Sequence, residues 1–317
     1  MHAESIKPFR EFVSTTNTIT STLILYLKPD EIYTQGMDGS QTTLFDATFP
    51  KKWFKGYEFD PTHDVADIMV DTSQLLSVLK IIDPANTTGL MLEVSSDRNK
   101  LIITAFNSPY NAKTNQNQNQ AMRKSKEFKL TLLDIDAELV NVLEKDCSVN
   151  MTLPSKVMYD IIKEHVQFGD NTTIRCTENV IALVTSGEVT QTTFMHIDDA
   201  QYGIESFEIE EEYAYKLTYK TRQLERMLQF YKASGPSGKA KVSFDDDHPF
   251  MVVFSCSNQA TATEVQTDCH SHALIRIYIA PMVATDPINE VDERAEESAD
   301  ALQEQLEHTD MNAMMTD

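Results

Sequence analysis

Three short stretches of this sequence carry side chains that could bind a metal ion or a phosphate. Asp245–His248 places carboxylates and an imidazole side by side, and oxygen-rich groups of this kind bind divalent cations. Cys269–His272 offers thiol and imidazole groups, which are common ligands of zinc. Gly235–Lys239 ends in the Gly-Lys pair that phosphate-binding loops use. Each stretch would imply an enzyme or a metalloprotein if its surroundings supported it.

The surroundings argue against catalysis. A closed zinc site needs four ligands, usually from two separated clusters, and Cys269–His272 is a single cluster. Asp245–His248 lies between two expected strands, where acidic residues are common in hairpin turns. The phosphate-loop pattern fails because Ala233 and Ala240 replace the Gly and the Ser or Thr that it requires. We therefore predict a protein that is not an enzyme and has no metal site and no cofactor. A metal-dependent enzyme that uses one of the two clusters stays open as an alternative.

One unit, a helix followed by antiparallel strands, occurs four times in the chain. The periodicity of apolar residues predicts each helix and each strand. The expected units are Pro8–Thr16 with Thr22–Tyr26 and Glu31–Gln35, Thr72–Ile82 with Leu90–Val94 and Leu101–Phe106, Ser155–Val166 with Thr172–Cys176 and Val180–Thr185, and Thr221–Ala233 with Lys241–Phe244 and Phe250–Phe254. Further strands are expected at Glu127–Leu133, Ser148–Leu153 and Leu274–Ile279, and Pro8 is expected in the first turn of its helix. The pattern predicts an α+β fold with two similar halves.

The charge of the chain conflicts with the charge of its helices. The formal net charge is −22, and the segment after Val283 holds eleven acidic residues against Arg294. The rest of the chain therefore still carries a net charge of about −12. All four expected helices nevertheless have basic residues on their polar faces. A body with this net charge repels nucleic acid unless its basic groups are gathered on one surface.

Several motifs resemble one known family, and they occur in the same order as in that family. Thr34–Leu44 contains Met-Asp-Gly-Ser and resembles the segment that follows the second strand of eukaryotic and archaeal sliding clamps. The other matching segments are Leu75–Lys80, Leu133–Asp136, Leu153–Ser155, Gly169–Asp170, Ser186–Glu188, His248–Pro249 and Tyr278–Pro281. The chain therefore resembles the proliferating cell nuclear antigen family of DNA sliding clamps.

The resemblance implies the DNA-clamp fold, with two similar domains that each have antiparallel sheets outside and two helices lining a pore. The N-terminal domain would span residues 1–132, with an Asn/Gln-rich loop at 107–126, and a connector would follow at 133–147. The C-terminal domain would span 148–283, before an acidic and disordered tail at 284–317. A head-to-tail homotrimer around duplex DNA is also implied, in which Lys124–Lys129 of one copy pairs with Gly187–Phe194 of the next.

Basic residues on the helices are the expected contacts to DNA, because Lys and Arg attract phosphates without reading bases. Four match basic pore positions of the family, namely Arg10, Lys80, Lys163 and Lys232. Three more share the polar faces by helical phase, namely Lys7, Arg222 and Arg226. Glu225 and Ser77 stand where the family usually has basic residues, so we expect the attraction to be weaker or shifted toward Arg222 and Arg226.

The resemblance also implies a pocket that binds short apolar motifs of a DNA polymerase and of the clamp loader. Aliphatic and aromatic anchors of such a motif would fill it. The expected pocket residues are Met37, Gln41, Leu44, Val142, Pro249, Tyr278, Ile279, Ala280 and Pro281.

The expected function is therefore that of a DNA polymerase processivity factor that recruits replication and repair proteins, in the nucleus or at a viral replication site. Its binding to double-stranded DNA would not depend on sequence. We see no secretory signal and no apolar run long enough to span a membrane. A processivity factor of another type, a checkpoint-clamp subunit and a β-rich structural protein remain as alternatives.

Overall fold

The computed structural model describes residue 1 and residues 3–59, 67–107, 123–134, 139–142, 146–210, 215–246, 248–256 and 272–282. Its helices are α1 (Ala3–Thr16), the 3-10 turn η1 (Lys51–Trp53), α2 (Thr72–Ile81), α3 (Val157–His165), α4 (Thr221–Leu228) and α5 (Tyr231–Ser234). Its strands are β1 (Thr22–Leu27), β2 (Glu31–Met37), β3 (Thr43–Pro50), β4 (Asp67–Asp71), β5 (Thr87–Val94), β6 (Lys100–Asn107), β7 (Arg123–Thr131), β8 (Val149–Pro154), β9 (Asn171–Cys176), β10 (Val180–Thr185), β11 (Gln191–His196), β12 (Ser206–Ile209), β13 (Tyr215–Lys220), β14 (Lys239–Asp245), β15 (His248–Cys256) and β16 (Ala273–Ile279).

The predicted repeat is confirmed. Each of the four expected helices precedes an antiparallel pair of strands, namely β1 with β2, β5 with β6, β9 with β10, and β14 with β15. The order of elements from α1 to β7 matches the order from α3 to β16, apart from the additional strand β12 and the break between α4 and α5. The chain is thus an α+β protein built from two similar halves.

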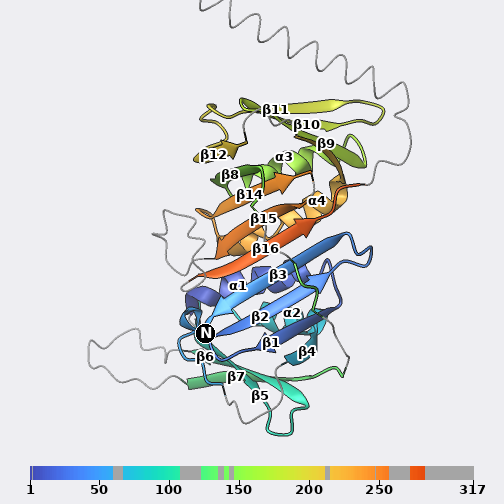
Figure 1. Cartoon of the computed structure of the whole chain (residues 1–317). Helices are drawn as coiled ribbons and strands as arrows, with labels where there is room; N and C mark the ends of the chain where they lie inside the picture. Colours follow the sequence, from blue (N-terminus) through green and yellow to red (C-terminus); the bar gives the residue numbers. More distant parts are fainter. Residues whose placement is uncertain are drawn as a thin grey trace, which may run out of the picture.

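The strands form three sheets (Figure 1). The largest has the order β12-β8-β14-β15-β16-β3-β2-β1-β4, so strands of both halves belong to one sheet that is joined where β16 pairs with β3. The four-stranded sheet has the order β11-β10-β9-β13, and the three-stranded sheet has the order β5-β6-β7. Because β3-β2-β1-β4 and β11-β10-β9-β13 are equivalent series, β11 occupies in the second half the place of β3 in the first.

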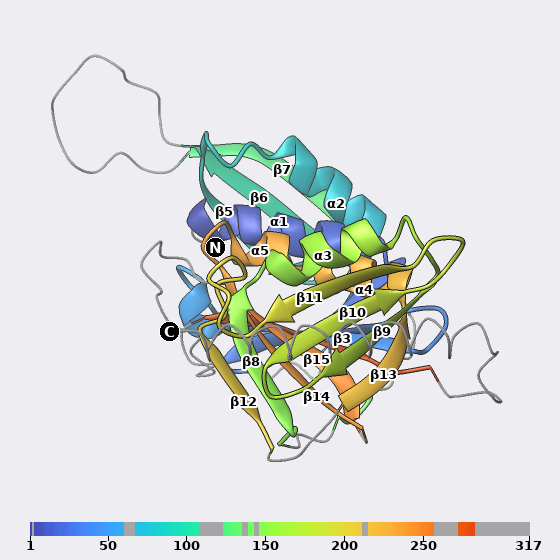
Figure 2. The same ribbon diagram turned by 90° about the horizontal axis from the view of Figure 1, so that it is seen from above.

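The helices lie together in one layer that packs against one side of the strands (Figure 2). In this layer α1 contacts both α2 and α5, and α3 contacts α4. The apolar stripe of each helix is buried, as its sequence predicted, and Phe12, Leu79, Ile162 and Leu224 are fully covered. Burial of these stripes is the main force that holds the layer on the sheets.

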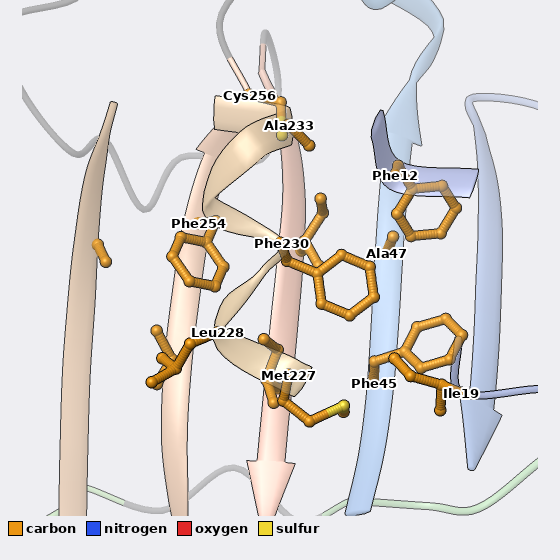
Figure 3. Packing of buried hydrophobic residues seen from close by; sticks show 14 of the residues in the cluster. Phe12, Ile19, Phe45, Ala47, Met227, Leu228, Phe230, Ala233, Phe254 and Cys256 are labelled. Atoms are coloured by element: carbon orange, nitrogen blue, oxygen red, sulfur yellow. The ribbon is translucent and has the colours of Figure 1, made fainter. Parts of the chain in front are cut away.

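An aromatic cluster joins the two halves of the chain (Figure 3). Phe12 of α1 and Phe45 of β3 pack against Phe230, which lies between α4 and α5, with ring centroids 5.7 Å and 5.5 Å from that of Phe230. All of these rings are fully buried. The core therefore runs without interruption from the first half into the second at the β3–β16 junction.

Four details of the secondary structure differ from the expectations. The first helix begins at Ala3, so Pro8 lies inside it and not in its first turn; the buried Ile6 and the hydrogen bond from Ser5 Oγ to the Trp53 carbonyl (3.4 Å) fix the earlier start. The expected helix Thr221–Ala233 is interrupted, because the N–H groups of Gln229 and Phe230 bond three residues back and turn the Phe230 ring into the core.

The expected strand Glu127–Leu133 instead runs over Arg123–Thr131, and Leu133 makes an isolated bridge with Met69. The sequence patterns also did not predict β3, β4, β12 and β13. The shifted bounds of β7 and the four unpredicted strands have the same cause. These segments become strands because they pair with other strands, and their own sequences do not show the pattern of a strand.

Some predictions lie outside the described residues. These include most of the Asn/Gln-rich loop at 107–126, part of the connector at 133–147 and all of the tail at 284–317. Within the described ranges, no helix is both long and apolar enough to cross a membrane.

Candidate functional site

The basic residues expected to contact DNA all lie on the helix layer. Lys7 and Lys80 are exposed, and so are Lys163, Arg222 and Arg226. Arg10 is half-buried beside Glu11, with Nη2 3.5 Å from Oε1, and Lys232 is exposed and donates a hydrogen bond to Gln229. These residues, from four separate segments of the chain, therefore share one layer.

The charge of this layer is mixed. Lys156 on α3 is paired with Asp160 at 2.6 Å, and Lys163 lies over the Tyr159 ring at 5.9 Å. Glu225 is half-buried and accepts a hydrogen bond from Gln229. Exposed ion pairs contribute little binding energy and are screened by salt, so the unpaired cations matter most. Among the residues that the structure describes, Lys7, Lys80, Arg222 and Arg226 have no carboxylate within ion-pair distance.

The expected partner-binding residues gather on the face of the large sheet that lies opposite the helices. Met37 pairs with Leu44 across β2 and β3, and Leu44 pairs with Tyr278 across β3 and β16. Neighbouring residues along each strand point to opposite sides, so Phe45 and Ile279 face the core. The side chain of Ile279 is fully buried and cannot line a surface, which removes it from the expected set. We call the remaining face the partner surface; it is formed by the half-buried Met37 and by Leu44 and Tyr278, which are 7% and 8% exposed.

The β2–β3 loop borders this surface. Gln41 is exposed at its tip with a φ of 58°, in the left-handed region that most side chains avoid. Ala280 follows β16, and its N–H donates to the Thr42 carbonyl at 2.9 Å. Pro281 follows β16 and Pro249 is the second residue of β15, and both are half-buried. The structure thus brings the loop and the end of β16 together.

A segment of the connector crosses the same face. The Gln35 amide forms two hydrogen bonds to the Val140 backbone, one donated by Nε2 to the carbonyl and one accepted by Oε1 from the N–H, each 2.8 Å long. Leu139 and Val140 expose 51% and 44% of their surface, and Val142 is half-buried. Gln35 therefore holds the connector while its apolar side chains stay accessible.

A buried ion pair lies beneath this segment. Asp46 of β3 is 4% exposed and accepts a hydrogen bond from Arg276 Nη1 of β16 at 3.0 Å. Burial and the Asp46 carboxylate raise the pKa of Tyr278 above its ordinary value, so its hydroxyl stays protonated. Burial, followed by the same carboxylate, likewise raises the pKa of Tyr33. The pair lies across the junction of the two halves and keeps Tyr278 as a neutral hydrogen-bond donor.

A buried histidine network lies in the four-stranded sheet. His165, at the end of α3, is fully buried; its Nδ1 lies 2.9 Å from Thr185 Oγ1 and its Nε2 lies 2.8 Å from Thr193 Oγ1. Thr172 extends the network from Thr185 to Thr221, the first residue of α4. Burial lowers the pKa of His165, which favours the neutral ring. No local pattern indicates the role of His165 or that of Gln35, because their hydrogen-bond partners are remote in the chain.

The candidate metal-binding stretches have other roles where the structure describes them. Asp245 accepts hydrogen bonds from the N–H and hydroxyl of Ser148, at 3.4 Å and 3.1 Å. Asp247 and most of Cys269–His272 lie outside the described residues. Within the described part, no three His, Cys, Asp or Glu side chains come together as a metal site. Gly235–Lys239 connects α5 to the start of β14, as expected for a loop.

Comparison with known proteins identifies the fold. The family model for the proliferating cell nuclear antigen C-terminal domain matches residues 141–265. The proliferating cell nuclear antigen of Thermococcus kodakaraensis superimposes with a TM-score of 0.69 at 17% identity, covering 87% of this chain and 97% of that one. The Entamoeba histolytica protein gives a TM-score of 0.67 at 18% identity, covering 88% and 96%. The fold is therefore the DNA-clamp fold.

Curated relatives extend the match along the sequence. A probable DNA polymerase sliding clamp 2 of Paramecium bursaria Chlorella virus 1 is 24% identical over 257 residues, which are 80% of this chain and 78% of that protein. The proliferating cell nuclear antigens of Chaetomium thermophilum and Saccharomyces cerevisiae are 22% and 23% identical, covering 80% and 72% of this chain and 85% and 81% of their own lengths. At this low identity, the chain is similar to curated sliding clamps over most of its length.

Proposed function

We propose that this chain closes with two further copies into a head-to-tail ring around duplex DNA and acts as a DNA polymerase processivity factor. The observation that carries the proposal is a pair of sheet edges. The strand β7 ends the three-stranded sheet and β11 ends the four-stranded sheet. Their equivalents in the repeat, β16 and β3, pair antiparallel with each other inside the chain.

The internal junction is therefore a template for a junction between copies. If β7 of one copy pairs with β11 of the next, the unpaired backbone groups of both edges gain partners. Since each copy has one β7 edge and one β11 edge, the pairing can be repeated from copy to copy until the ring closes. Exposed apolar side chains flank both edges and would be covered by this pairing. Ile81, at the end of α2, is 54% exposed and its carbonyl accepts a hydrogen bond from Lys126 of β7, and Val189, just before β11, is 60% exposed.

The helix layer would then line the ring. Its basic residues come from α1 to α5 and supply attraction to phosphates that does not depend on base sequence. At about 0.15 M salt, charges are screened over roughly 8 Å, so the acidic exterior hardly cancels a basic lining. Non-specific attraction combined with enclosure is what a protein needs to slide along DNA without leaving it.

The partner surface and the connector would recruit polymerase, clamp loader and other replication and repair proteins. Exposed Leu139 and Val140, held on β2 by the hydrogen bonds of Gln35, would offer apolar contacts to the aliphatic and aromatic anchors of a short peptide. In this role the chain has no catalytic residues of its own. Its place of action would be the nucleus or a viral replication site.

Sedimentation and processivity test this proposal. We expect a mass near three chains without DNA, and reduced polymerase processivity for the double variant Lys80→Ala, Lys163→Ala at unchanged mass. A matched control removes two exposed lysines outside the helix layer, Lys52→Ala with Lys55→Ala. Equal processivity of the two double variants would contradict the DNA-facing role of the helix layer, and a monomer at all concentrations would contradict the ring.

A further inference from the structure

A single glutamine of the helix layer reaches the border of the partner surface. Gln223 belongs to α4 and lies between Arg222 and Arg226, which point to the exposed side of that helix. Its Nε2 lies 2.7 Å from Thr42 Oγ1, 3.0 Å from Ser40 Oγ and 3.4 Å from Asp38 Oδ2. All of these contacts use the amide nitrogen as donor, and all of them end on the β2–β3 loop.

This loop is held by one buried carboxylate. Asp38 is 8% exposed, and its Oδ1 accepts the N–H groups of Thr42 and Thr43 at 3.1 Å and 3.0 Å. The Ser40 hydroxyl donates to Oδ2 of the same carboxylate. Gln41, at the tip, has the left-handed backbone that a residue other than glycine adopts only when its surroundings impose it. Gln223 adds a donor to this group of acceptors from outside the loop.

The loop in turn positions the end of β16. The Thr42 carbonyl, on the residue that Gln223 contacts most closely, accepts the N–H of Ala280. Met37 and Leu44, on the strands that enter and leave the loop, are part of the partner surface. A change in the position of the Thr42 hydroxyl therefore moves the border of that surface.

We propose that Gln223 is a positioning residue for partner binding: from the DNA-facing helix α4, it holds the β2–β3 loop in the shape that accepts a short apolar peptide. The inference rests on the proposed function, since it concerns the same partner surface. The inference requires a hydrogen-bond donor at position 223, because the hydrogen-bond partners of Gln223 Nε2 are all oxygen atoms. Helix α4 thus belongs both to the DNA-facing layer and to the support of the partner surface.

The substitution Gln223→Glu tests the donor requirement. Glutamate has the same shape but no donor when ionised, and it brings a second carboxylate beside Asp38. The probe is a fluorescent synthetic peptide with aliphatic and aromatic anchors, taken from a polymerase terminus and titrated against the full chain. Loss of one net hydrogen bond weakens binding by about 5-fold or more. Gln223→Lys restores a donor and should bind within about 2-fold of the wild type, whereas a residue that only fills space would not distinguish Lys from Glu.

Gln229→Glu is the matched control, because it makes the same chemical change near the end of α4 and contacts Glu225 and Lys232 but not the loop. If Gln223→Glu does not fold by circular dichroism, Thr42→Val removes the closest acceptor and provides the same comparison. If the wild type binds the peptide and Gln223→Glu binds it with the same affinity, this inference is wrong while the proposed function stands. The same holds for Thr42→Val where it replaces Gln223→Glu. Absence of binding by the wild-type ring would instead overturn the proposed partner surface and the inference with it.

Discussion

Removing one backbone N–H from the outer edge of β11 should open the proposed ring. The Ile197 N–H donates to the Asn179 carbonyl at 3.0 Å, and hydrogen-bonded pairs alternate along an antiparallel ladder. The N–H groups of Thr192, Phe194 and His196 therefore point away from β10, toward the open edge. The hydrogen bond from Tyr202 Oη to the Phe194 carbonyl, on that same side, agrees with this orientation. Thr192→Pro removes one outward donor and leaves the bonds to β10 in place.

The expected magnitude follows from the internal junction. There β16 pairs with β3 over Leu274–Ile279 and Thr43–Thr48, a length that β11 matches. One missing hydrogen bond, with an unpaired carbonyl left on the facing strand, costs about 1–3 kcal/mol per junction. That corresponds to a roughly 5- to 150-fold weaker junction, and a closed ring contains the defect at each of its junctions. The ring should therefore dissociate at protein concentrations at which the wild type remains assembled.

Sedimentation equilibrium over a range of concentrations measures this effect, with Thr192→Ala as the control. The alanine variant loses the same side chain but keeps the N–H, so any difference between the two variants reports on the backbone donor. Circular dichroism and the melting temperature of the dissociated chain show whether the four-stranded sheet survives. A folded Thr192→Pro protein that assembles as tightly as Thr192→Ala would refute pairing through the outer edge of β11.

Three further predictions concern the interior and the connector. Gln35→Ala removes both hydrogen bonds to Val140, worth about 1–3 kcal/mol together, and should make the connector more sensitive to limited proteolysis than Gln35→Glu, which keeps the acceptor. Asp46→Ala leaves the partly buried Arg276 without its carboxylate and should lower the free energy of unfolding by about 2–4 kcal/mol in urea titrations, more than Asp46→Asn does. Because burial lowers the pKa of His165, the unfolded chain takes up a proton at this residue before the folded chain does as pH falls. The free energy of unfolding should therefore decrease below a pH of about 6.5, by at most about 1.4 kcal/mol per pH unit. Between pH 7.5 and 5.5, the melting temperature of His165→Gln should fall less than that of the wild type.

Local sequence pattern was sufficient where one face of an element is covered and the other is not. Thr172–Cys176 was predicted as a strand and is β9 (Asn171–Cys176), in which buried residues alternate with more exposed ones. The β3 segment, Thr43–Pro50, is buried along its whole length, because β2 and β16 flank it and both of its faces are covered. Its sequence therefore lacks the alternation of apolar and polar residues that marks a half-exposed strand. The break after Leu228 was likewise not predictable, since it depends on the contact of Phe230 with Phe12 and Phe45.

The same distinction applies to the site. Exposure of Lys80 and Arg226 follows from helical phase, because three or four residues separate neighbours on one face. The roles of Gln35 and Gln223 depend on partners about 105 and 181 residues away, and an isolated glutamine carries no sign of such a partner. The resemblance to a family suggested the residues of the partner surface, but it also included Ile279. The side chain of Ile279 points into the core, because side chains alternate between the two faces of a strand.

The internal junction and the proposed junction between copies differ in composition in a way that would suit a ring that must open. The internal strands β16 and β3 read Ala-Leu-Ile-Arg-Ile-Tyr-Ile and Thr-Leu-Phe-Asp-Ala-Thr-Phe-Pro, and the Phe12, Phe45 and Phe230 cluster seals them on the core side. The edge strands β7 and β11 read Arg-Lys-Ser-Lys-Glu-Phe-Lys-Leu-Thr and Gln-Thr-Thr-Phe-Met-His, which are far more polar. Polar edges stay soluble when unpaired, and a junction built mainly from backbone hydrogen bonds is weaker than one sealed by buried aromatic rings. The same strand-pairing geometry would thus give a permanent junction within the chain and a reversible junction between copies. A protein that encircles a continuous DNA molecule requires the reversible junction, because its ring must open to admit the DNA.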